Sequence, residues 1–224
     1  MKKFHKESFD KISEDKRQRI LKVGIAEFSK KGLSATNINV VAKKAGISIG
    51  SLYNYFASKE DLYMAIADEG YRILEKVFSS IDLSTGDMFD KLEKLVRAAI
   101  EYSRRYPELT QIYLDLSTES RSRLSERLSK KIEEISSNYY QYLIGESKKA
   151  GLIDQNIDDR IASFCFDNLI LILQYSYSSK YFIERMKIFV GEDALKDDER
   201  VIKGVMRFIR GAFSAAGAPP GARG

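Results

Sequence analysis

The side chains best suited to chemistry lie in one short stretch near the N-terminus. Residues 48–56 have the pattern of a short helix in which Leu52 and Phe56, four positions apart, face inward. The opposite face would present five residues to a partner, namely Ser48, Ile49, Gly50, Tyr53 and Asn54. Their hydroxyl, amide and apolar groups suit hydrogen bonding and apolar contact, and they contain no nucleophile–base pair.

Catalytic and metal-binding chemistry has little support in the sequence. The single histidine is His5, and the single cysteine is Cys165, which lies in an apolar stretch and is interpreted as a small core residue. There is no glycine-rich phosphate loop and no metal-ligand spacing. We therefore expect no enzyme activity, no cofactor and no metal. A carboxylate pair is the one open route to catalysis, which turnover in a pH–rate search would reveal.

A helical pattern and a tight turn position this stretch. A second short helix ends at Gly46, where the turn needs a backbone conformation that a Cβ would strain. The small core between the two helices would be filled by Val41, Ala42, Ala45, Ile47 and Leu52. Upstream, an apolar stripe from about Glu14 predicts a helix that ends at Gly32. The sequence therefore predicts a helix-turn-helix over about residues 37–56.

The charge distribution points to a polyanion as the partner. Residues 1–61 hold 13 Lys and Arg against 7 Asp and Glu, whereas residues 62–224 hold 24 against 25. The positive excess therefore lies wholly in the first quarter of the chain, as expected for a nucleic-acid-binding module on a neutral body. The alternative is a solvated surface with surplus lysines.

The run from Ile38 to Leu62 closely resembles the signature of the tetracycline-repressor (TetR) family. The matching positions in it are Ala45-Gly46-Ile47-Ser48, Gly50, Leu52-Tyr53, Phe56 and Ser58-Lys59-Glu60. Those in the preceding helix are Arg19-Ile20-Leu21, Ala26, Phe28 and Gly32. The resemblance covers about residues 16–66, and beyond them only the family's architecture is recognisable. It implies a DNA-binding transcriptional regulator.

The resemblance also implies a role for individual residues. The helix that follows Ser48 would enter the major groove, with Ile49 and Gly50 near base edges and Tyr53 and Lys59 on phosphates. The remaining DNA contacts would come from Thr36, Asn37, Lys43, Lys44 and Asn54. Thr36 sits where the N-cap of the preceding helix belongs, and a helix N-terminus favours an anion.

Two positions depart from the family pattern. Ile49 stands where the family often has Lys or Arg, which indicates apolar contact, for example with a thymine methyl, in place of guanine recognition. Tyr55 stands where a histidine is common, and its hydroxyl could replace that histidine on a phosphate. Alternatively, Tyr53 and Tyr55 are packing aromatics, and Lys43 and Lys44 are merely solvated.

The fold expected is all-α with about nine helices, an N-terminal three-helix DNA-binding domain and a C-terminal helical bundle. Residues 1–13 are expected to be a flexible basic arm, 14–61 the DNA-binding domain, 62–214 the effector and dimerisation domain, and 215–224 a disordered tail. One apolar segment, 161–189, has a possible break near Ser178.

A helix-turn-helix monomer contacts few base pairs, so we expect a homodimer on a palindromic operator. Two apolar helices near the C-terminus would form the dimer surface, through Ile161, Leu169, Ile172, Val205, Phe208, Ile209 and Phe213. An apolar pocket edged by tyrosines would hold a small apolar or aromatic effector. Its lining is predicted to include Tyr102, Tyr106, Tyr113, Tyr139, Phe164 and Tyr175.

By analogy with the family, effector binding would release the repressor from DNA through a population shift. The absence of a signal peptide and of a membrane span in the sequence leads us to expect a cytoplasmic protein with no membrane partner. The alternatives are a helical interaction or membrane-surface protein, and a DNA-binding protein, activator or repressor, without an effector.

Overall fold

The computed structural model describes the backbone of residues 3–118 and 123–214, and their side chains except for 118 and 123–132. This part of the chain is helical with no strand, which confirms the predicted all-α class. Its elements are α1 (Glu7–Asp10), α2 (Glu14–Ala35), α3 (Ile38–Lys44), α4 (Ile49–Tyr55), α5 (Lys59–Ser79), α6 (Met88–Arg105), α7 (Pro107–Thr118), α8 (Arg123–Lys149), α9 (Asp159–Tyr175), α10 (Lys180–Val190), the 3₁₀ helix η1 (Ala194–Lys196) and α11 (Asp198–Phe213). The predicted disordered tail, 215–224, lies outside the described residues.

The described residues form eleven α-helices where about nine were expected, and two features account for the difference. The apolar segment 161–189 is divided into α9 and α10 by a turn, in which Ser179 N donates to Tyr175 O (2.9 Å). The expected flexible arm contains α1, whose Phe9 is only 2% exposed. Burial of this ring supplies the apolar stabilisation that an arm without a core contact would lack.

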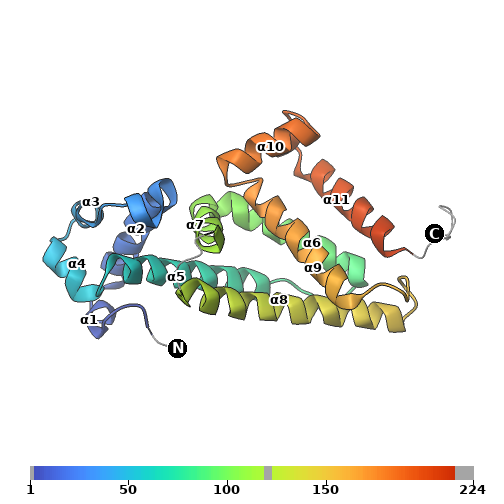
Figure 1. Cartoon of the computed structure of the whole chain (residues 1–224), viewed down its shortest axis with the longest axis horizontal. Helices are drawn as coiled ribbons and strands as arrows, with labels where there is room; N and C mark the ends of the chain where they lie inside the picture. Colours follow the sequence, from blue (N-terminus) through green and yellow to red (C-terminus); the bar gives the residue numbers. More distant parts are fainter. Residues whose placement is uncertain (1–2, 119–122, 215–224) are drawn as a thin grey trace. The chain divides into compact units, whose positions relative to one another are not determined.

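The chain forms two compact units, residues 1–76 with 106–128 and residues 77–105 with 129–224. The first unit contains α1 to α4, most of α5, and α7 (Figure 1). Its core is formed by Ile20, Phe28, Leu52, Phe56 and Leu62, none more than 1% exposed, and by Ile112 of α7. The boundary expected after residue 61 therefore falls inside this unit, because α5 and α7 share its core.

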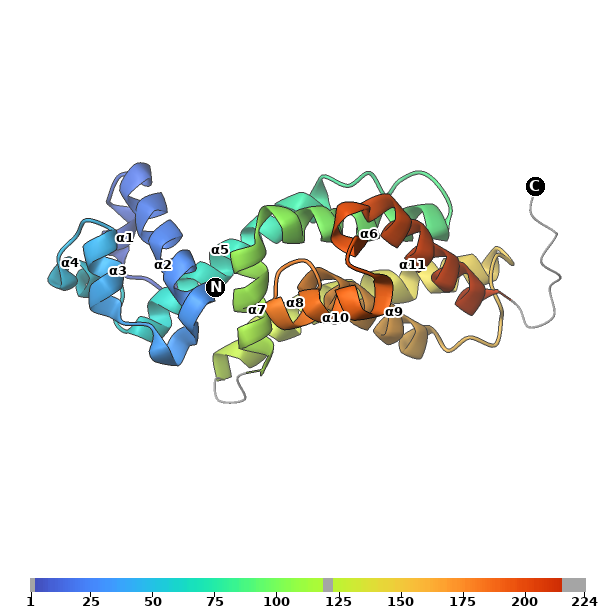
Figure 2. The same cartoon turned by 90° about the horizontal axis from the view of Figure 1, so that it is seen from above.

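The second unit contains α6, most of α8, and α9 to α11. Both α9 and α11 pack against α6 (Figures 1 and 2). The core between these helices includes Leu95, Val96, Tyr140, Phe166 and Met206. None of the helices in the described part of the chain is both long and apolar enough to cross a bilayer.

A carboxylate lies within the packing of this second unit. Asp167 of α9 is half-buried, and desolvation, reinforced by the charge of Glu133, raises its pKa to about 6. A hydrogen bond with Ser136 opposes this shift only in part. The ionised form of Asp167 is therefore less favourable in the folded chain than in the unfolded chain.

This raised pKa predicts a pH-dependent stability. The pKa of Asp167 is about 6 in the folded chain and near 3.9 in the unfolded chain. The free energy of unfolding that this carboxyl contributes is therefore greatest below pH 4, falls as the pH rises from 4 to 6, and is lost above pH 6. The free energy of unfolding of Asp167→Asn should therefore equal that of the wild type near pH 4. Above pH 6.5 it should be higher, by on the order of 1 kcal/mol after solvent screening. Thermal unfolding of both proteins between pH 4 and 7.5 measures this. A difference in Tm that does not change with pH would contradict it.

Candidate nucleic-acid interface

The turn between α3 and α4 is fixed by its glycine and by helix caps. Gly46 has φ of 68°, in the left-handed region, and Ile47 N donates to Ala42 O (3.1 Å). Ser48 caps α4, since its Oγ accepts from Ser51 N at 3.0 Å. The cap of α3 is Asn37, whose side chain accepts from Asn39 N at 2.9 Å. The expected cap at Thr36 is thus displaced by one residue.

The predicted small core lies beneath this turn. Val41, Ala42, Ala45 and Leu52 are each at most 2% exposed, and Ile47 packs against them half-buried. Ala42 and Ala45 are small enough for the two short helices to approach closely. The core therefore orients α4 with one face inward and the other toward solvent.

The outward face of α4 carries the predicted DNA-contacting residues. Ile49 is 36% exposed and Tyr53 is 47% exposed, although both are large apolar side chains. Gly50 and Asn54 are also exposed, and positions 49, 50, 53 and 54 share one face of a helix. Apart from the adjoining residues and the backbone of the helix itself, the atom nearest to the position of a Cβ on Gly50 is Ser48 Oγ, at 3.9 Å. The helix thus presents bare backbone at Gly50.

Two predicted DNA contacts lie inside the unit. Thr36 is 3% exposed, because its hydroxyl donates to Gly32 O (2.7 Å) and Glu27 O (3.3 Å) at the end of α2. Tyr55 is 6% exposed, and its ring lies 5.8 Å from that of Phe9. These burials correct the expectation that both side chains face a phosphate.

Two of the three predicted lysines have partners within the protein. Lys44 pairs with the buried Glu27 at 2.5 Å, and this contact, with that of Lys31, lowers the pKa of Glu27. Lys59 donates to Ser34 O (3.0 Å) and Thr36 O (3.3 Å), so it caps the C-terminal end of α2. Lys43 is exposed.

One positioning residue was not predicted. Arg19 of α2 donates from Nε to Ala45 O at 3.0 Å, and so caps the C-terminal end of α3. The resemblance included Arg19 only as a matching position. A sequence pattern offers no signal that pairs a side chain with a carbonyl 26 residues away.

The six predicted ligand contacts divide between the two units. Tyr106 and Tyr113 belong to the first unit, and the other four belong to the second. Tyr102 and Tyr175 are buried, Tyr139 is half-buried, and Phe164 is 68% exposed on α9. Phe164 therefore cannot line an interior pocket of its own unit, because it lies on the outward side of an amphipathic helix.

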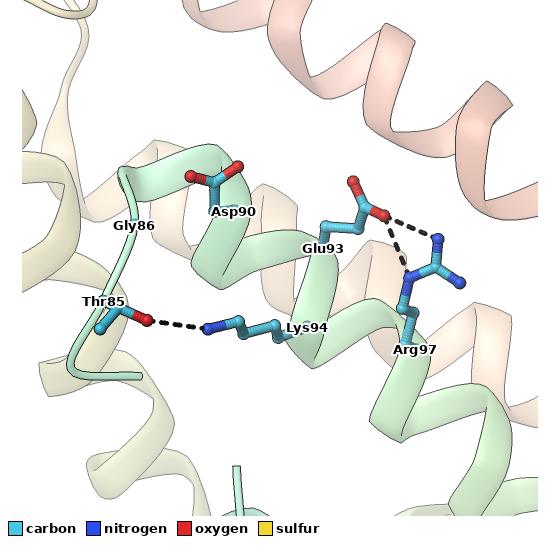
Figure 3. A pocket seen from close by; sticks show the side chains of 6 residues that line it. All are labelled: Thr85, Gly86, Asp90, Glu93, Lys94 and Arg97. Carbon is cyan, nitrogen blue, oxygen red and sulfur yellow. Dashed lines mark hydrogen bonds and ion pairs between the residues drawn. The ribbon is translucent and has the colours of Figure 1, made fainter. Parts of the chain in front are cut away.

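Two hollows in the second unit are grooves with charged linings. One, of about 360 Å³, is lined by Thr85, Gly86, Asp90, Glu93, Lys94 and Arg97 (Figure 3). The other, of about 420 Å³ between α6 and α11, contains Arg97, Arg104, Asp198 and Glu199. Internal ion pairs hold these side chains, as between Arg97 and Glu93 (2.7 Å) and between Arg104 and Asp198 (2.6 Å). Neither groove has the apolar, tyrosine-edged lining that the sequence predicts.

The predicted dimer residues divide between surface and core. Ile161, Ile172 and Phe208 are exposed by 64%, 40% and 68%, whereas Leu169 and Val205 are half-buried. Ile209 and Phe213 are only 3% and 6% exposed and belong to the core of the second unit. Their assignment to the dimer surface is corrected, because α11 turns these side chains inward.

Comparison with known proteins identifies relatives of the N-terminal region. Residues 20–66 match the family model described as bacterial regulatory proteins, tetR family. The HTH-type transcriptional repressor KstR2 of Mycobacterium tuberculosis is 32% identical over 100 residues, which are 45% of this chain and 50% of the relative. The chain spans about half the length of the curated relatives it matches.

Solved structures share the fold over most of the chain. A TetR family transcriptional regulator from Chloroflexus aurantiacus superimposes with a TM-score of 0.74 at 23% identity, over 95% of this chain and 99% of that one. The transcriptional regulator FadR from Bacillus subtilis, solved in complex with stearoyl-CoA, gives 0.65 at 16% identity, over 86% and 97%. At such identities the likeness concerns the fold.

The open space at Gly50 predicts opposite effects on stability and on DNA binding. Gly50→Ala should leave the fold intact and stabilise it by up to about 1 kcal/mol, because alanine is the better helix former. Affinity for DNA should fall at least tenfold, since the methyl group would occupy the surface to which the resemblance assigns a base edge. Thermal unfolding and fluorescence anisotropy measure the two effects. Gly145→Ala, in α8, is the matched control and should change stability alone; equal DNA affinity of the two variants would contradict the prediction.

Proposed function

We propose that this chain is a member of the tetR family of bacterial regulatory proteins, whose model its residues 20–66 match, and that it is a dimeric, sequence-specific repressor of transcription. The observation that carries the proposal is the exposed face of α4. A tetR-type helix-turn-helix presents large apolar and hydrogen-bonding groups to solvent there, with Ile49 and Tyr53 both well exposed. A helix face of this kind fits the major groove.

Contacts with DNA would be divided between bases and phosphates. Ile49 and the backbone at Gly50 would approach base edges, whereas the hydroxyl of Tyr53 and the ammonium of Lys43 would meet phosphates. Asn37 and Asn54 are exposed and would supply further hydrogen bonds. The excess of positive charge in residues 1–61 supports attraction to the DNA backbone.

A homodimer would place two such helices on the half-sites of a palindromic operator. The support comes from exposed apolar side chains on α9 and α11, above all Phe164 and Phe208, each 68% exposed. Singly exposed apolar residues are common, but Ile161, Phe164, Ile172 and Phe208 together provide apolar area on two helices of one unit, both of which pack against α6. A second copy of the chain would cover it.

The effector proposed is a small lipophilic molecule bound by the second unit, and an acyl-CoA is the first class to test. The likeness to FadR, which was solved with stearoyl-CoA, supports this choice, as does the aromatic content of the unit. Effector binding would favour a conformation with low affinity for the operator. Effector binding would then weaken operator binding, and operator binding would weaken effector binding.

DNA binding is tested with the fragment upstream of the chain's own gene and with sites selected from a random-sequence pool. Wild-type protein should bind a selected site with nanomolar affinity and a steep salt dependence. Tyr53→Phe should weaken binding about fivefold, roughly the loss of one hydrogen bond, and Lys43→Ala should reduce the salt slope by about one. Lys59 is a poor choice of variant, because it also caps α2.

The same experiment contains its control and its effector arm. Lys149→Ala, an exposed lysine on α8, should leave both affinity and salt slope unchanged. Stearoyl-CoA added to the complex should release the DNA. Failure to select any sequence from the pool would overturn the proposed function, whereas specific binding that no acyl-CoA relieves would overturn only the effector class.

The dimer surface makes a separate prediction. Phe208→Asp should convert a dimer to a monomer at micromolar concentration, because a two-fold contact would bring two carboxylates into a desolvated interface. Tyr142→Asp, at a position 63% exposed on α8, is the matched control and should stay dimeric. Light scattering coupled to size exclusion gives the mass of each. A wild-type monomer, or an unaltered Phe208→Asp dimer, would contradict the assignment.

A further inference from the structure

The helix that carries the proposed DNA-contacting face is too short to be stable by itself, and its C-terminal carbonyl groups need partners from elsewhere in the chain. α4 contains seven residues, whereas isolated helices below about 12–15 residues are marginal in water. The last four carbonyls of any helix have no partner within it. In α4 these belong to Leu52, Tyr53, Asn54 and Tyr55.

All four carbonyls are nevertheless hydrogen-bonded, and three of the partners come from the N-terminal segment. Lys6 donates from Nζ to Tyr53 O (2.8 Å) and from its backbone N to Tyr55 O (2.8 Å). Ser8 Oγ donates to Asn54 O at 2.5 Å. The fourth, Leu52 O, accepts from Phe56 N at 2.9 Å. Residues 6–8 therefore form a C-cap for a helix that follows more than 40 positions later.

An aromatic anchor holds this segment in place. Phe9 is 2% exposed, and its ring centroid lies 4.7 Å from that of Phe56, directly after α4. Contacts within the segment stiffen it further, since Asp10 accepts from Lys3 (2.7 Å) and pairs with His5 (2.9 Å). These two contacts lower the pKa of Asp10 to about 2.

The charge of Lys6 also suits this position. The C-terminal end of a helix carries partial negative charge, which a cation stabilises. The ammonium group of Lys6 lies on the carbonyl of Tyr53, in the last turn of α4. Lys6 therefore contributes to the fold of the recognition helix in addition to the net charge of the region.

We propose that residues 6–9 are a positioning element for operator recognition, which fixes the last turn of α4 so that Tyr53 and Asn54 face DNA. The inference rests on the proposed DNA-binding function. The two side chains that leave this turn outward belong to residues whose own carbonyls are capped by Lys6 and Ser8. Loosening the cap would reorient these side chains without altering them.

A basic arm that simply attracts DNA is the competing explanation, and the two differ in salt dependence. Removing a phosphate contact lowers the slope of affinity against salt, whereas removing an uncharged positioning contact lowers affinity at unchanged slope. Ser8→Ala and Phe9→Ala carry no change of charge. Lys11→Ala removes an exposed charge just after α1 and serves as the matched control.

The test combines hydrogen exchange of the free protein with binding to a selected operator. Ser8→Ala and Phe9→Ala should accelerate exchange of the amides of residues 53–56 at least fivefold and weaken operator binding by about five- to tenfold at unchanged salt slope. Ser8→Thr, which keeps the hydroxyl donor, should restore both properties. Lys11→Ala should leave exchange unchanged. If Phe9→Ala does not fold, the pair Ser8→Ala and Ser8→Thr decides alone.

Two outcomes would overturn the proposal. In one, exchange in α4 is the same in Ser8→Ala and Phe9→Ala as in the wild type. In the other, exchange accelerates but operator affinity is unchanged, so that the cap serves the fold alone. Wild-type protein that binds no DNA would refute the proposed function, whereas the exchange data would still report whether the N-terminal segment holds α4.

Discussion

The first unit, which carries the proposed DNA-binding face, depends on hydrogen bonds to the carbonyl groups at the ends of its short helices. α3 and α4 have seven residues each, so their unpaired terminal groups are a large fraction of their backbone. Two cations from outside these helices bond to their ends, Arg19 to the end of α3 and Lys6 to the end of α4, and Lys59 bonds in the same way to the end of the longer α2. Each bond also offsets the negative end of a helix dipole. Tertiary contacts therefore hold the geometry that a seven-residue helix cannot hold alone.

This constraint changes the interpretation of the basic N-terminal region. Part of its positive charge serves the fold, since Lys6, Lys44 and Lys59 all have partners within the unit. The exposed face of α4 contributes hydrogen-bonding and apolar groups instead of charge. A regulator built in this way would draw general attraction from the remaining lysines and specificity from Ile49, Gly50 and Tyr53.

The second unit combines polar grooves with apolar helix faces. Ion pairs of Arg97 and Arg104 connect α6 to the start of α11, and the carboxylates of Glu199 and Glu93 raise the pKa of Arg97. Exposed apolar side chains lie on α9 and α11, where Phe164 and Phe208 are each 68% exposed. The proposed roles follow this division. The ion pairs stabilise the packing of α6 against α11, and the apolar faces of α9 and α11 would contact a second copy of the chain in a dimer.

The sequence by itself determined the all-α class, the turn at Gly46, the cap at Ser48 and the outward face of α4, because each follows from local periodicity or from the conformational demands of one residue. Tertiary structure alone decided which side chains turn inward. Thr36 and Tyr55 are polar enough for a surface yet buried, and Phe164 is apolar yet exposed. The pairing of Lys6 and Ser8 with α4 joins residues more than 40 positions apart, and such pairings depend on how helices pack, which no local pattern records.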